Sequence, residues 1–542
     1  MDVNIDTLPI INGIKYFERW IPMTDGTRLY LSVMLPANGD KFPTIFFRNP
    51  YVEDVPTNFE EFVNYNCVKC ERGYAFIFQH CRGCGQSEGG WVPYDYERND
   101  GLDTLNWIRT LPWYNGEIFL DGGSYSATVH WSYLDTNPSD VKAASLSVQD
   151  VNRYNIAYRN GFFKNKLHGG WFCRGYLKKD KTLYRNEKET FHDFPLCEFS
   201  MRQWGHKVRT MDNVLTHPRP DDPFWQSYDM GSGADCRNGL LKSTMPILLM
   251  TGHYDIYTEG VHDMWRETPD ERLANCAFLV DGYDHGGNCP QWAKGTRGEC
   301  PDGERMVGGT PPSRINVVLD WFDHVRLGKE FPYCDLGKTR YYAMWENKWL
   351  TDKSLTDGER TVSLKIGNES HTWQYDPLRP APVFPGSGGI CFGGFEAQPE
   401  PNFRDDVVSF ILPEAEEELD VRGRITADLT VKSDCEDTCF YIRVSINKGD
   451  GIWYLLRDDI MSLCWDRKDY TPGEKKTIHF RFADHAFRIE KGDQLRVDIS
   501  SACDQFAPHP NVKGDAFAVS KPKTANNTIV AEESYLHLYV KK

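Results

Sequence analysis

The sequence I-F-L-D-G-G-S-Y-S-A-T-V-H-W, from Ile118 to Trp131, places an apolar run, a glycine-rich turn and an apolar-periodic segment in succession. This order predicts a strand, a sharp turn and a helix, the context that exposes a serine, here Ser124, as a nucleophile. Small residues suit the turn because side chains at Gly122 and Ser126 would collide where strand and helix approach closely. The usual pattern, G-x-S-x-G, ends in glycine, whereas Ser126 stands at that position. Since such a serine can also be an ordinary turn or N-cap residue, the nucleophile needs a base, an acid and an oxyanion hole elsewhere in the chain.

Length and composition favour a globular protein of about two to four domains. The net charge of −16 disfavours a nucleic-acid or anionic-membrane partner. The first residues lack a basic region followed by an apolar core, so we expect no signal peptide, and no apolar run approaches the length of a transmembrane helix. Without export, the sixteen cysteines are expected to be reduced thiols. We therefore expect a cytoplasmic protein.

Strand patterns alternate with a helical pattern on the N-terminal side of the turn. The strand-like runs are Lys15–Phe17, Arg28–Val33, Phe42–Phe47 and Tyr74–Phe78, and the helical run is Asp100–Thr110. Such alternation predicts parallel βαβ units whose reactive loops gather at the carboxyl edge of the sheet. Residues 145–240 break this rhythm, because they are rich in aromatic and basic residues and lack strong strand runs. We interpret them as an inserted, mostly helical cap, since roughly 95 residues are too many for a simple crossover; an ordinary helical layer on the sheet is the alternative.

Two further strand patterns each end at a residue that a serine nucleophile requires. Met245–Met250 leads to Asp255, and Cys276–Val280 leads to His285. The order Ser124, Asp255, His285 is that of α/β-hydrolases. A histidine must take the serine proton and return it to the leaving group, and a carboxylate must hold the imidazole in the right tautomer.

Other acids compete with Asp255 for this role. Asp281 and Asp284 lie too close to His285 in sequence to approach its ring easily from a separate loop, and Asp263 falls within a helical pattern. Asp255 is therefore the preferred acid.

Short alternating runs dominate after about residue 340 and predict an antiparallel β-sandwich of the jelly-roll kind. They are Arg340–Trp345, Asp406–Leu412, Arg424–Val431, Phe440–Ile446, Thr477–Phe482, Gln494–Ser500 and Tyr535–Val540. The predicted fold is thus of the α/β class, an α/β-hydrolase domain with a helical cap insertion plus a C-terminal all-β jelly-roll domain. The expected bounds are 1–144 and 241–339 for the two parts of the hydrolase domain, 145–240 for the cap and 340–542 for the jelly roll.

Several motifs along the chain resemble one family. They are R-N-P-Y (48–51), Q-H-C-R-G-C-G-Q-S-E-G-G-W (79–91), D-G-L-D-T-L-N-W-I (100–108), G-G-S-Y-S-A (122–127) and W-F-D-H (321–324). By these motifs the chain resembles the cocaine-esterase-like and X-Pro dipeptidyl-peptidase family of α/β-hydrolase serine hydrolases, which includes α-amino-acid ester hydrolases. One position departs from the family pattern: Ala127 stands where the family has glycine.

The resemblance implies a role for each candidate site residue. Ser124 would be the nucleophile, Asp255 the acid and His285 the base. The hydroxyl of Tyr51 and the backbone N–H of Tyr125 would form the oxyanion hole, where each donor is worth roughly 3 kcal/mol. Without the resemblance, Tyr51 would be interpreted as a packed turn residue. No cofactor is implied.

Two questions remain open at this level. Trp171 and Phe172 could line the acyl pocket or belong to the core. The pairs Cys67-x-x-Cys70 and Cys81-x-x-Cys84 resemble zinc knuckles, although the strand pattern between them and the fit of the second pair to the family block argue against a metal.

The predicted function is cleavage of an ester or amide through an acyl-enzyme, with carboxylesterase or acylase as first choice. The alternative is an X-Pro dipeptidyl-peptidase or α-amino-acid ester hydrolase; the large N-terminal extension of some X-Pro peptidases is missing here. A further alternative is an inactive hydrolase that acts as a binding module. The expected partner is a small ester, amide or short peptide, and a homo-oligomer is left open.

Overall fold

One mixed sheet of eleven strands runs through the N-terminal two thirds of the computed structural model, which describes residues 7–52, 59–179, 192–226, 237–286, 311–355, 358–382 and 397–541. Its strand order is β1-β2-β3-β5-β4-β6-β7-β10-β11-β12-β13. The strands are β1 (Ile10–Ile11), β2 (Ile14–Pro22), β3 (Arg28–Pro36), β4 (Phe42–Asn49), β5 (Ala75–His80), β6 (Tyr114–Gly123), β7 (Val141–Ser147), β10 (Ile247–Tyr254), β11 (Ala277–Asp284), β12 (Thr339–Ala343) and β13 (Lys348–Asp352). Neighbours from β5 to β12 pair in parallel, and the outer strands pair antiparallel.

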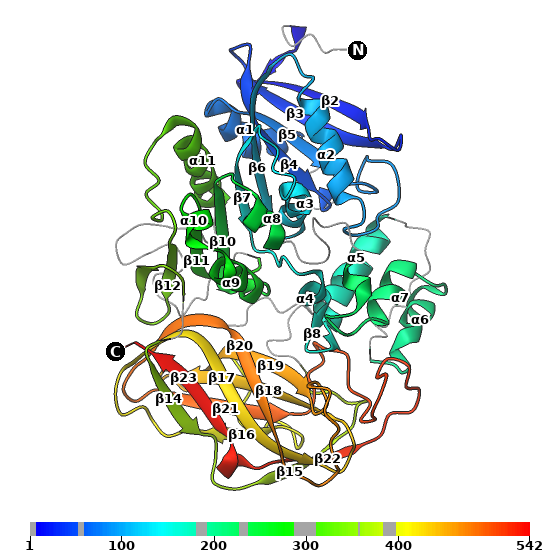
Figure 1. Ribbon diagram of the computed structural model, residues 1–542, viewed down its shortest axis with the longest axis vertical. Coiled ribbons are helices and arrows are strands. Elements are labelled where there is room, and N and C mark those ends of the chain that lie inside the picture. The colour runs from blue at the N-terminus through cyan, green and yellow to red at the C-terminus, as the bar shows by residue number, and fades with distance from the viewer. Residues whose placement is uncertain are drawn as a thin grey trace.

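Helices cover both faces of this sheet (Figure 1). Helices α1 (Phe59–Glu71) and α11 (Pro311–Leu327) share one buried apolar cluster with the sheet. The other cluster holds side chains of α2 (Glu97–Ile108), α3 (Tyr125–Leu134), α8 (Arg237–Lys242), α9 (Thr258–Glu267) and α10 (Asp270–Leu273). Because the central strands are buried on both faces, they consist of nearly continuous apolar runs such as Ile118-Phe119-Leu120.

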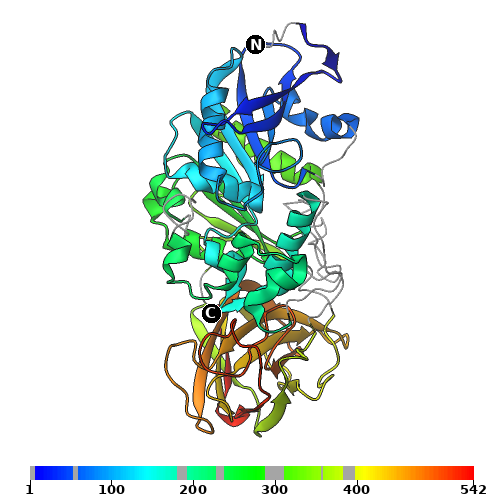
Figure 2. The same ribbon diagram turned by 90° about the vertical axis from the view of Figure 1, so that its right-hand side faces the viewer.

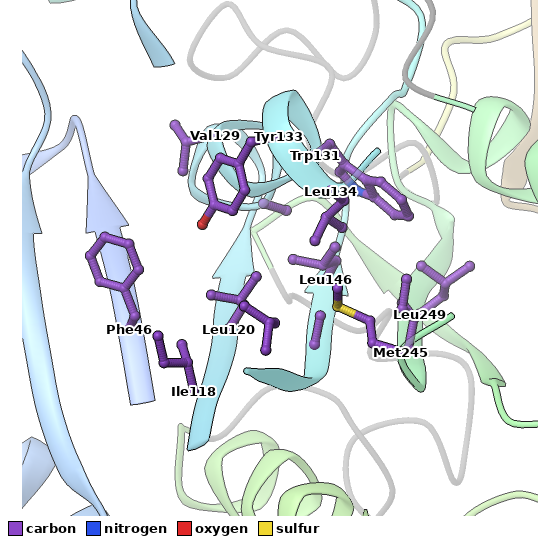
Figure 3. Close-up of a cluster of buried hydrophobic side chains, with 14 of the residues drawn as sticks. Phe46, Ile118, Leu120, Val129, Trp131, Tyr133, Leu134, Leu146, Met245 and Leu249 are labelled. Carbon is purple, nitrogen blue, oxygen red and sulfur yellow. The ribbon is translucent and has the colours of Figure 1, made fainter. Parts of the chain in front are cut away.

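The second cluster fixes α3 against the sheet. Figure 3 shows Tyr133 and Leu134 of α3 on the side of the helix that faces Leu120 of β6 and Leu146 of β7. All ten residues of α3 are buried. This packing holds the start of the helix, and therefore Ser124, in place at the carboxyl end of β6.

The described residues between β7 and β10 are mostly helical. This segment contains α4 (Arg153–Ala157), the short hairpin β8 (Tyr158–Arg159) and β9 (Phe162–Phe163), the π-helical turn η3 (Asn165–Gly169), α5 (Gly170–Lys179), η4 (Leu196–Glu198), α6 (Phe199–Trp204), α7 (Arg209–Leu215) and η5 (Pro223–Gln226). Its aromatic side chains form a buried cluster of their own. The segment lies between the large sheet and the C-terminal domain (Figures 1 and 2).

The C-terminal domain is built from two antiparallel sheets around one apolar core, as expected for a β-sandwich. Its elements are β14 (Arg360–Lys365), β15 (His371–Tyr375), β16 (Val408–Ile411), β17 (Leu419–Ser433), β18 (Cys439–Asn447), β19 (Trp453–Ser462), β20 (Lys476–Ile489), β21 (Gln494–Ser500), β22 (Ala525–Ile529), η6 (Ala531–Glu533) and β23 (Tyr535–Val540). Strands β14, β23, β17, β22, β15 and β20 form one sheet, and β16, β21, β18 and β19 form the other.

One predicted strand lies in a different sheet from the one expected. The run Arg340–Trp345 was expected in the antiparallel domain, but β12 pairs in parallel with β11, with Thr339 opposite Phe278. Strand β13 then closes the edge of the large sheet. The sequence of such a short strand does not indicate which sheet it joins, because the strand that pairs with it lies far away in the sequence. Among the described residues, no helix has both the length and the apolar character needed to cross a membrane.

Candidate active site

Ser124 occupies the sharp turn between β6 and α3, as the sequence predicts. Its backbone angles are φ 57° and ψ −130°, a region that non-glycine residues rarely adopt. A Cβ at Gly122 would lie 2.1 Å from the Ser126 carbonyl oxygen, so this position requires glycine. The expectation that a side chain at Ser126 would collide is wrong, because its buried hydroxyl fits 3.5 Å from Asn49 Oδ1. Ala127 is also fully buried without disturbing the turn.

The three residues predicted as a triad meet at the carboxyl edge of the sheet. His285 Nε2 lies 2.9 Å from Ser124 Oγ, and His285 Nδ1 lies 2.8 Å from Asp255 Oδ2. The Asp255 side chain is fully buried, and that of His285 is 13% exposed. A carboxylate accepts hydrogen bonds only, so Nδ1 carries the proton that faces Asp255 and Nε2 is the acceptor for the serine hydroxyl. The hydroxyl thus has a base within reach.

Tyr257 supports this arrangement, although nothing in the sequence singled it out. Its backbone N–H donates to the second oxygen of Asp255 at 2.7 Å. Its ring meets the His285 ring edge to face, with centroids 5.3 Å apart and an interplanar angle of 89°. The carboxylate and the imidazole are therefore held by neighbours as well as by each other. The proximity of Tyr257 to Asp255 in sequence was the only available signal.

The competing acids have other contacts. Asp263 forms ion pairs with Arg266 and Arg424. Asp284 accepts a hydrogen bond from the N–H of Gly286 at 2.9 Å. Asp281 is buried and accepts from the N–H of Gly282 at 2.6 Å, and burial raises its pKa to about 8.

Tyr51 lies beside Ser124, at the end of the R-N-P-Y motif. Its backbone N–H donates to Asn49 Oδ1 at 2.9 Å, which fixes the turn after β4. Its hydroxyl lies near Ser124, which counteracts part of the rise in its pKa, and accepts a hydrogen bond from Trp171 Nε1 at 3.1 Å. Burial raises the pKa of Tyr51 to about 12, so the phenol stays protonated and can donate at neutral pH.

Tyr125 is the first residue of α3, where backbone N–H groups have no carbonyl partner one turn earlier. Its hydroxyl donates to Glu97 Oε1 at 2.8 Å and accepts from the N–H of Tyr94. Glu97 is in turn paired with the buried Arg48 at 2.9 Å. The arginine of R-N-P-Y therefore anchors the residue that follows Ser124, a link between two motifs that only the fold reveals.

The two aromatic residues predicted for the pocket lie in different surroundings. Trp171 is partly exposed, contacts Tyr51 and stacks on Tyr125 with ring centroids 5.9 Å apart. Phe172 is 2% exposed and packs against Trp204 of the helical segment and against Trp91 of the loop before α2. Only Trp171 reaches the site around Ser124.

The four cysteines of the zinc alternative are divided between two apolar clusters. Cys67 and Cys70 pack with α1 and α11, whereas Cys81 and Cys84 belong to the cluster on the other face. Within the described segments, no group of three or more His, Cys, Asp or Glu side chains is arranged to hold a metal ion. The structure gives the zinc alternative no support.

A cavity of about 400 Å³ adjoins Asp255 between the sheet, the helical segment and the C-terminal domain. The charged residues in its lining are Asp150, Arg159, Lys164, Asp255, Glu259, Asp263, Arg457, Asp458 and Asp459. Arg159 donates to both carboxylate oxygens of Asp459, at 2.8 and 2.9 Å, and also contacts Glu259. One side chain of the helical segment thus ties the hydrolase sheet to the C-terminal domain.

Comparisons with known proteins agree with this architecture. The family model of the X-Pro dipeptidyl-peptidase (S15 family) matches residues 25–286, and that of the X-Pro dipeptidyl-peptidase C-terminal non-catalytic domain matches residues 328–537. Cocaine esterase from Rhodococcus sp. (strain MB1 Bresler) is 25% identical, over 94% of this chain and 91% of that protein.

Two solved structures share the fold over the whole chain. An aminopeptidase from a marine sediment archaeon, Thaumarchaeota archaeon, has a TM-score of 0.80 at 16% identity and covers 100% of this chain and 98% of its own. A selenomethionine-labelled α-amino-acid ester hydrolase has a TM-score of 0.81 at 18% identity, with both chains fully covered. At these identities the likeness establishes the fold.

Proposed function

Because the chain belongs to the cocaine-esterase-like and X-Pro dipeptidyl-peptidase (S15) family of serine hydrolases, we propose that it is a carboxylesterase or acylase that forms an acyl-enzyme on Ser124. The observation that carries this proposal is the continuous chain of hydrogen bonds from Ser124 through His285 to Asp255, with distances of 2.9 and 2.8 Å. It lies at a turn whose backbone conformation exposes the serine hydroxyl.

In the acylation step, Ser124 Oγ attacks the carbonyl carbon of the substrate while His285 Nε2 takes the hydroxyl proton. Asp255 stabilises the imidazolium that forms and keeps its Nδ1–H directed toward the carboxylate. His285 then returns the proton to the leaving alcohol or amine. Water repeats the sequence on the acyl-enzyme and releases the acid.

The negative charge on the carbonyl oxygen needs donors that are already in place. We assign this role to the Tyr51 hydroxyl and the backbone N–H of Tyr125. Two observations support the assignment: the Tyr51 hydroxyl lies near Ser124, and Tyr125 begins the helix that follows it. The positive end of the α3 dipole adds to the stabilisation of the oxyanion.

Aromatic rings surround the proposed nucleophile, which favours an aromatic or otherwise apolar acyl group. Trp171 stacks on the ring of Tyr125, Tyr94 packs against it at a tilt, and Tyr51 meets it edge to face. Tyr257 closes the side next to His285. An ester is preferred over a peptide because the relative that spans 94% of the chain is named cocaine esterase.

The acidic cavity beside Asp255 favours a second candidate, an X-Pro dipeptidyl-peptidase or α-amino-acid ester hydrolase. Such an enzyme needs carboxylates for a free ammonium group, and the cavity lining carries Asp150, Glu259 and Asp458. Glu259 already contacts Arg159, and Asp458 accepts from the Tyr441 hydroxyl. An ammonium group would have to compete with these partners, so this function ranks second.

Labelling with a fluorophosphonate probe separates an active hydrolase from an inactive binding module. We expect stoichiometric modification of Ser124 and none in Ser124→Ala, which should also lose p-nitrophenyl ester turnover while it stays folded. Absence of labelling in the native chain would refute the hydrolase mechanism, and residual turnover by Ser124→Ala would mean that another serine reacts.

A matched panel of substrates separates the two candidate functions. Benzoyl, phenylacetyl and acetyl p-nitrophenyl esters should be compared with Ala-Pro and Gly-Pro p-nitroanilides. We expect higher kcat/KM for the aromatic esters, and preferential cleavage of the X-Pro amides would establish the second candidate instead.

The proposal includes a cytoplasmic location. No disulfide joins the cysteines of the described segments, which suits a reducing compartment. Fractionation of the source cells with an antibody against the chain tests this, and recovery outside the cytoplasmic fraction would contradict it.

A further inference from the structure

Trp171 links the helical segment to the hydroxyl proposed as an oxyanion donor. It is the second residue of α5, and its Nε1–H donates to Tyr51 Oη at 3.1 Å. Tyr51 in turn contacts Ser124, and Ser124 contacts His285. The side chains therefore form one series of neighbours, which begins in the helical segment and ends at Asp255.

The chemistry of the indole group determines the direction of this series. An indole N–H can only donate, whereas a phenol has one proton and two lone pairs. The bond from Trp171 must therefore occupy a lone pair of Tyr51, which leaves the phenolic proton free to point toward Ser124. A hydroxyl that accepts a hydrogen bond also becomes a stronger donor, because bonds in series polarise each other.

Neighbouring rings hold Trp171 where this bond can form. It stacks on Tyr125, meets Trp91 edge to face at 5.2 Å, and lies against His168 at 5.6 Å. Burial lowers the pKa of His168 well below its usual value, so no imidazolium forms beside the indole at neutral pH. A rotation of Trp171 would therefore require several packed rings to move.

We propose that Trp171 is a positioning residue that directs the Tyr51 hydroxyl toward the forming oxyanion. This rests on the proposed function, because it needs Tyr51 to act as an oxyanion donor. Through Trp171 the helical segment would contribute to the chemical step as well as form a wall of the pocket. A wall residue contributes to substrate binding, whereas a positioning residue contributes through Tyr51 alone.

A double-mutant cycle distinguishes the two roles. We expect Trp171→Phe to lower kcat by roughly three- to tenfold in the native enzyme, the effect of one neutral hydrogen bond. In a Tyr51→Phe background the same substitution should leave kcat unchanged, because the acceptor is gone. The matched control is Trp225→Phe, which removes an indole N–H bonded to the His217 carbonyl within the same segment and should not change kcat.

Equal losses of kcat in both backgrounds would overturn the proposal, and so would a change confined to KM. If Tyr51→Phe alone left kcat unchanged, this inference would also fail, while the labelling of Ser124 would still test the hydrolase itself. If Trp171→Phe does not fold, site-specific benzothienylalanine at position 171 replaces N–H by sulfur in a ring of nearly the same shape. It should reproduce the loss of kcat with an unchanged melting temperature, and native kcat in that variant would refute the role of the N–H.

Discussion

The backbone conformation of Ser124 should carry a measurable cost in stability, which two substitutions can isolate. Ser124→Ala and Ser124→Gly both remove Oγ and its contact with His285, so that loss is the same in each. They differ in the backbone, because φ 57° with ψ −130° is unfavourable for alanine and accessible to glycine. The difference in unfolding free energy between the two variants therefore reports the strain at the turn.

The size of the difference follows from two opposing contributions. A residue held in a sparsely populated backbone region costs about 1–3 kcal/mol. Glycine gives back about 0.4–1 kcal/mol through the greater freedom of its unfolded chain. The methyl group of alanine adds little because Ser124 is partly exposed. We expect Ser124→Gly to be more stable than Ser124→Ala by about 0.5–2 kcal/mol.

Urea denaturation followed by tryptophan fluorescence measures this difference, provided that the two variants unfold with equal slopes. Ser126, two residues later and the second residue of α3, supplies a matched control, where alanine should be more stable than glycine by about 1 kcal/mol. The opposite order at the two positions is the expected result. If alanine were at least as stable as glycine at position 124, the turn would not be strained and the argument would be wrong.

Three further substitutions test other parts of the structure. Gly122→Ala places a Cβ 2.1 Å from the Ser126 carbonyl oxygen and should prevent formation of the native turn. The expected readout is loss of soluble protein or a sharply lower Tm. Gly90→Ala is the control and should be tolerated, because a Cβ there would meet no atom within 4 Å. Because burial raises the pKa of Asp281 to about 8, the folded chain keeps a proton that the unfolded chain releases near pH 4. The unfolding free energy should therefore fall as the pH rises from about 4 to 8, by at most about 1.4 kcal/mol per pH unit. Urea denaturation across this range should show a flatter pH profile for Asp281→Asn than for the native chain, and a higher unfolding free energy at pH 8. Asp255→Asn should lower kcat by about 10³–10⁴-fold with little change in KM, and a loss below tenfold would exclude Asp255 as the acid.

The sequence was most informative where chemistry and local backbone geometry coincide. The strand, turn and helix around Ser124 could be predicted because glycine and small residues are needed there for steric reasons that act over a few positions. Asp255 and His285 could be placed because parallel strands bring their carboxyl ends to one edge. These three side chains meet in the structure as their positions after successive strands suggested.

Contacts between distant elements could not be predicted in the same way. The pairing of Arg48 with Glu97, which anchors Tyr125, joins a residue of one motif to a residue that lies outside all of them. Trp171 and Phe172 are adjacent and both aromatic, yet the helix directs one toward Tyr51 and the other into the core. Only the packing of α5 decides between them.

Arg159 has a consequence for attempts to shorten the protein. Its guanidinium binds a carboxylate from the C-terminal domain on one side and Glu259, two residues past Tyr257, on the other. A fragment that ends at residue 355 would lose Asp459 and the Arg481 carbonyl oxygen and leave this arginine with Glu259 alone of these partners. The sandwich domain, although its family description is non-catalytic, thus supports the hydrolase domain through this arginine, and its removal should loosen the loop that carries Asp255.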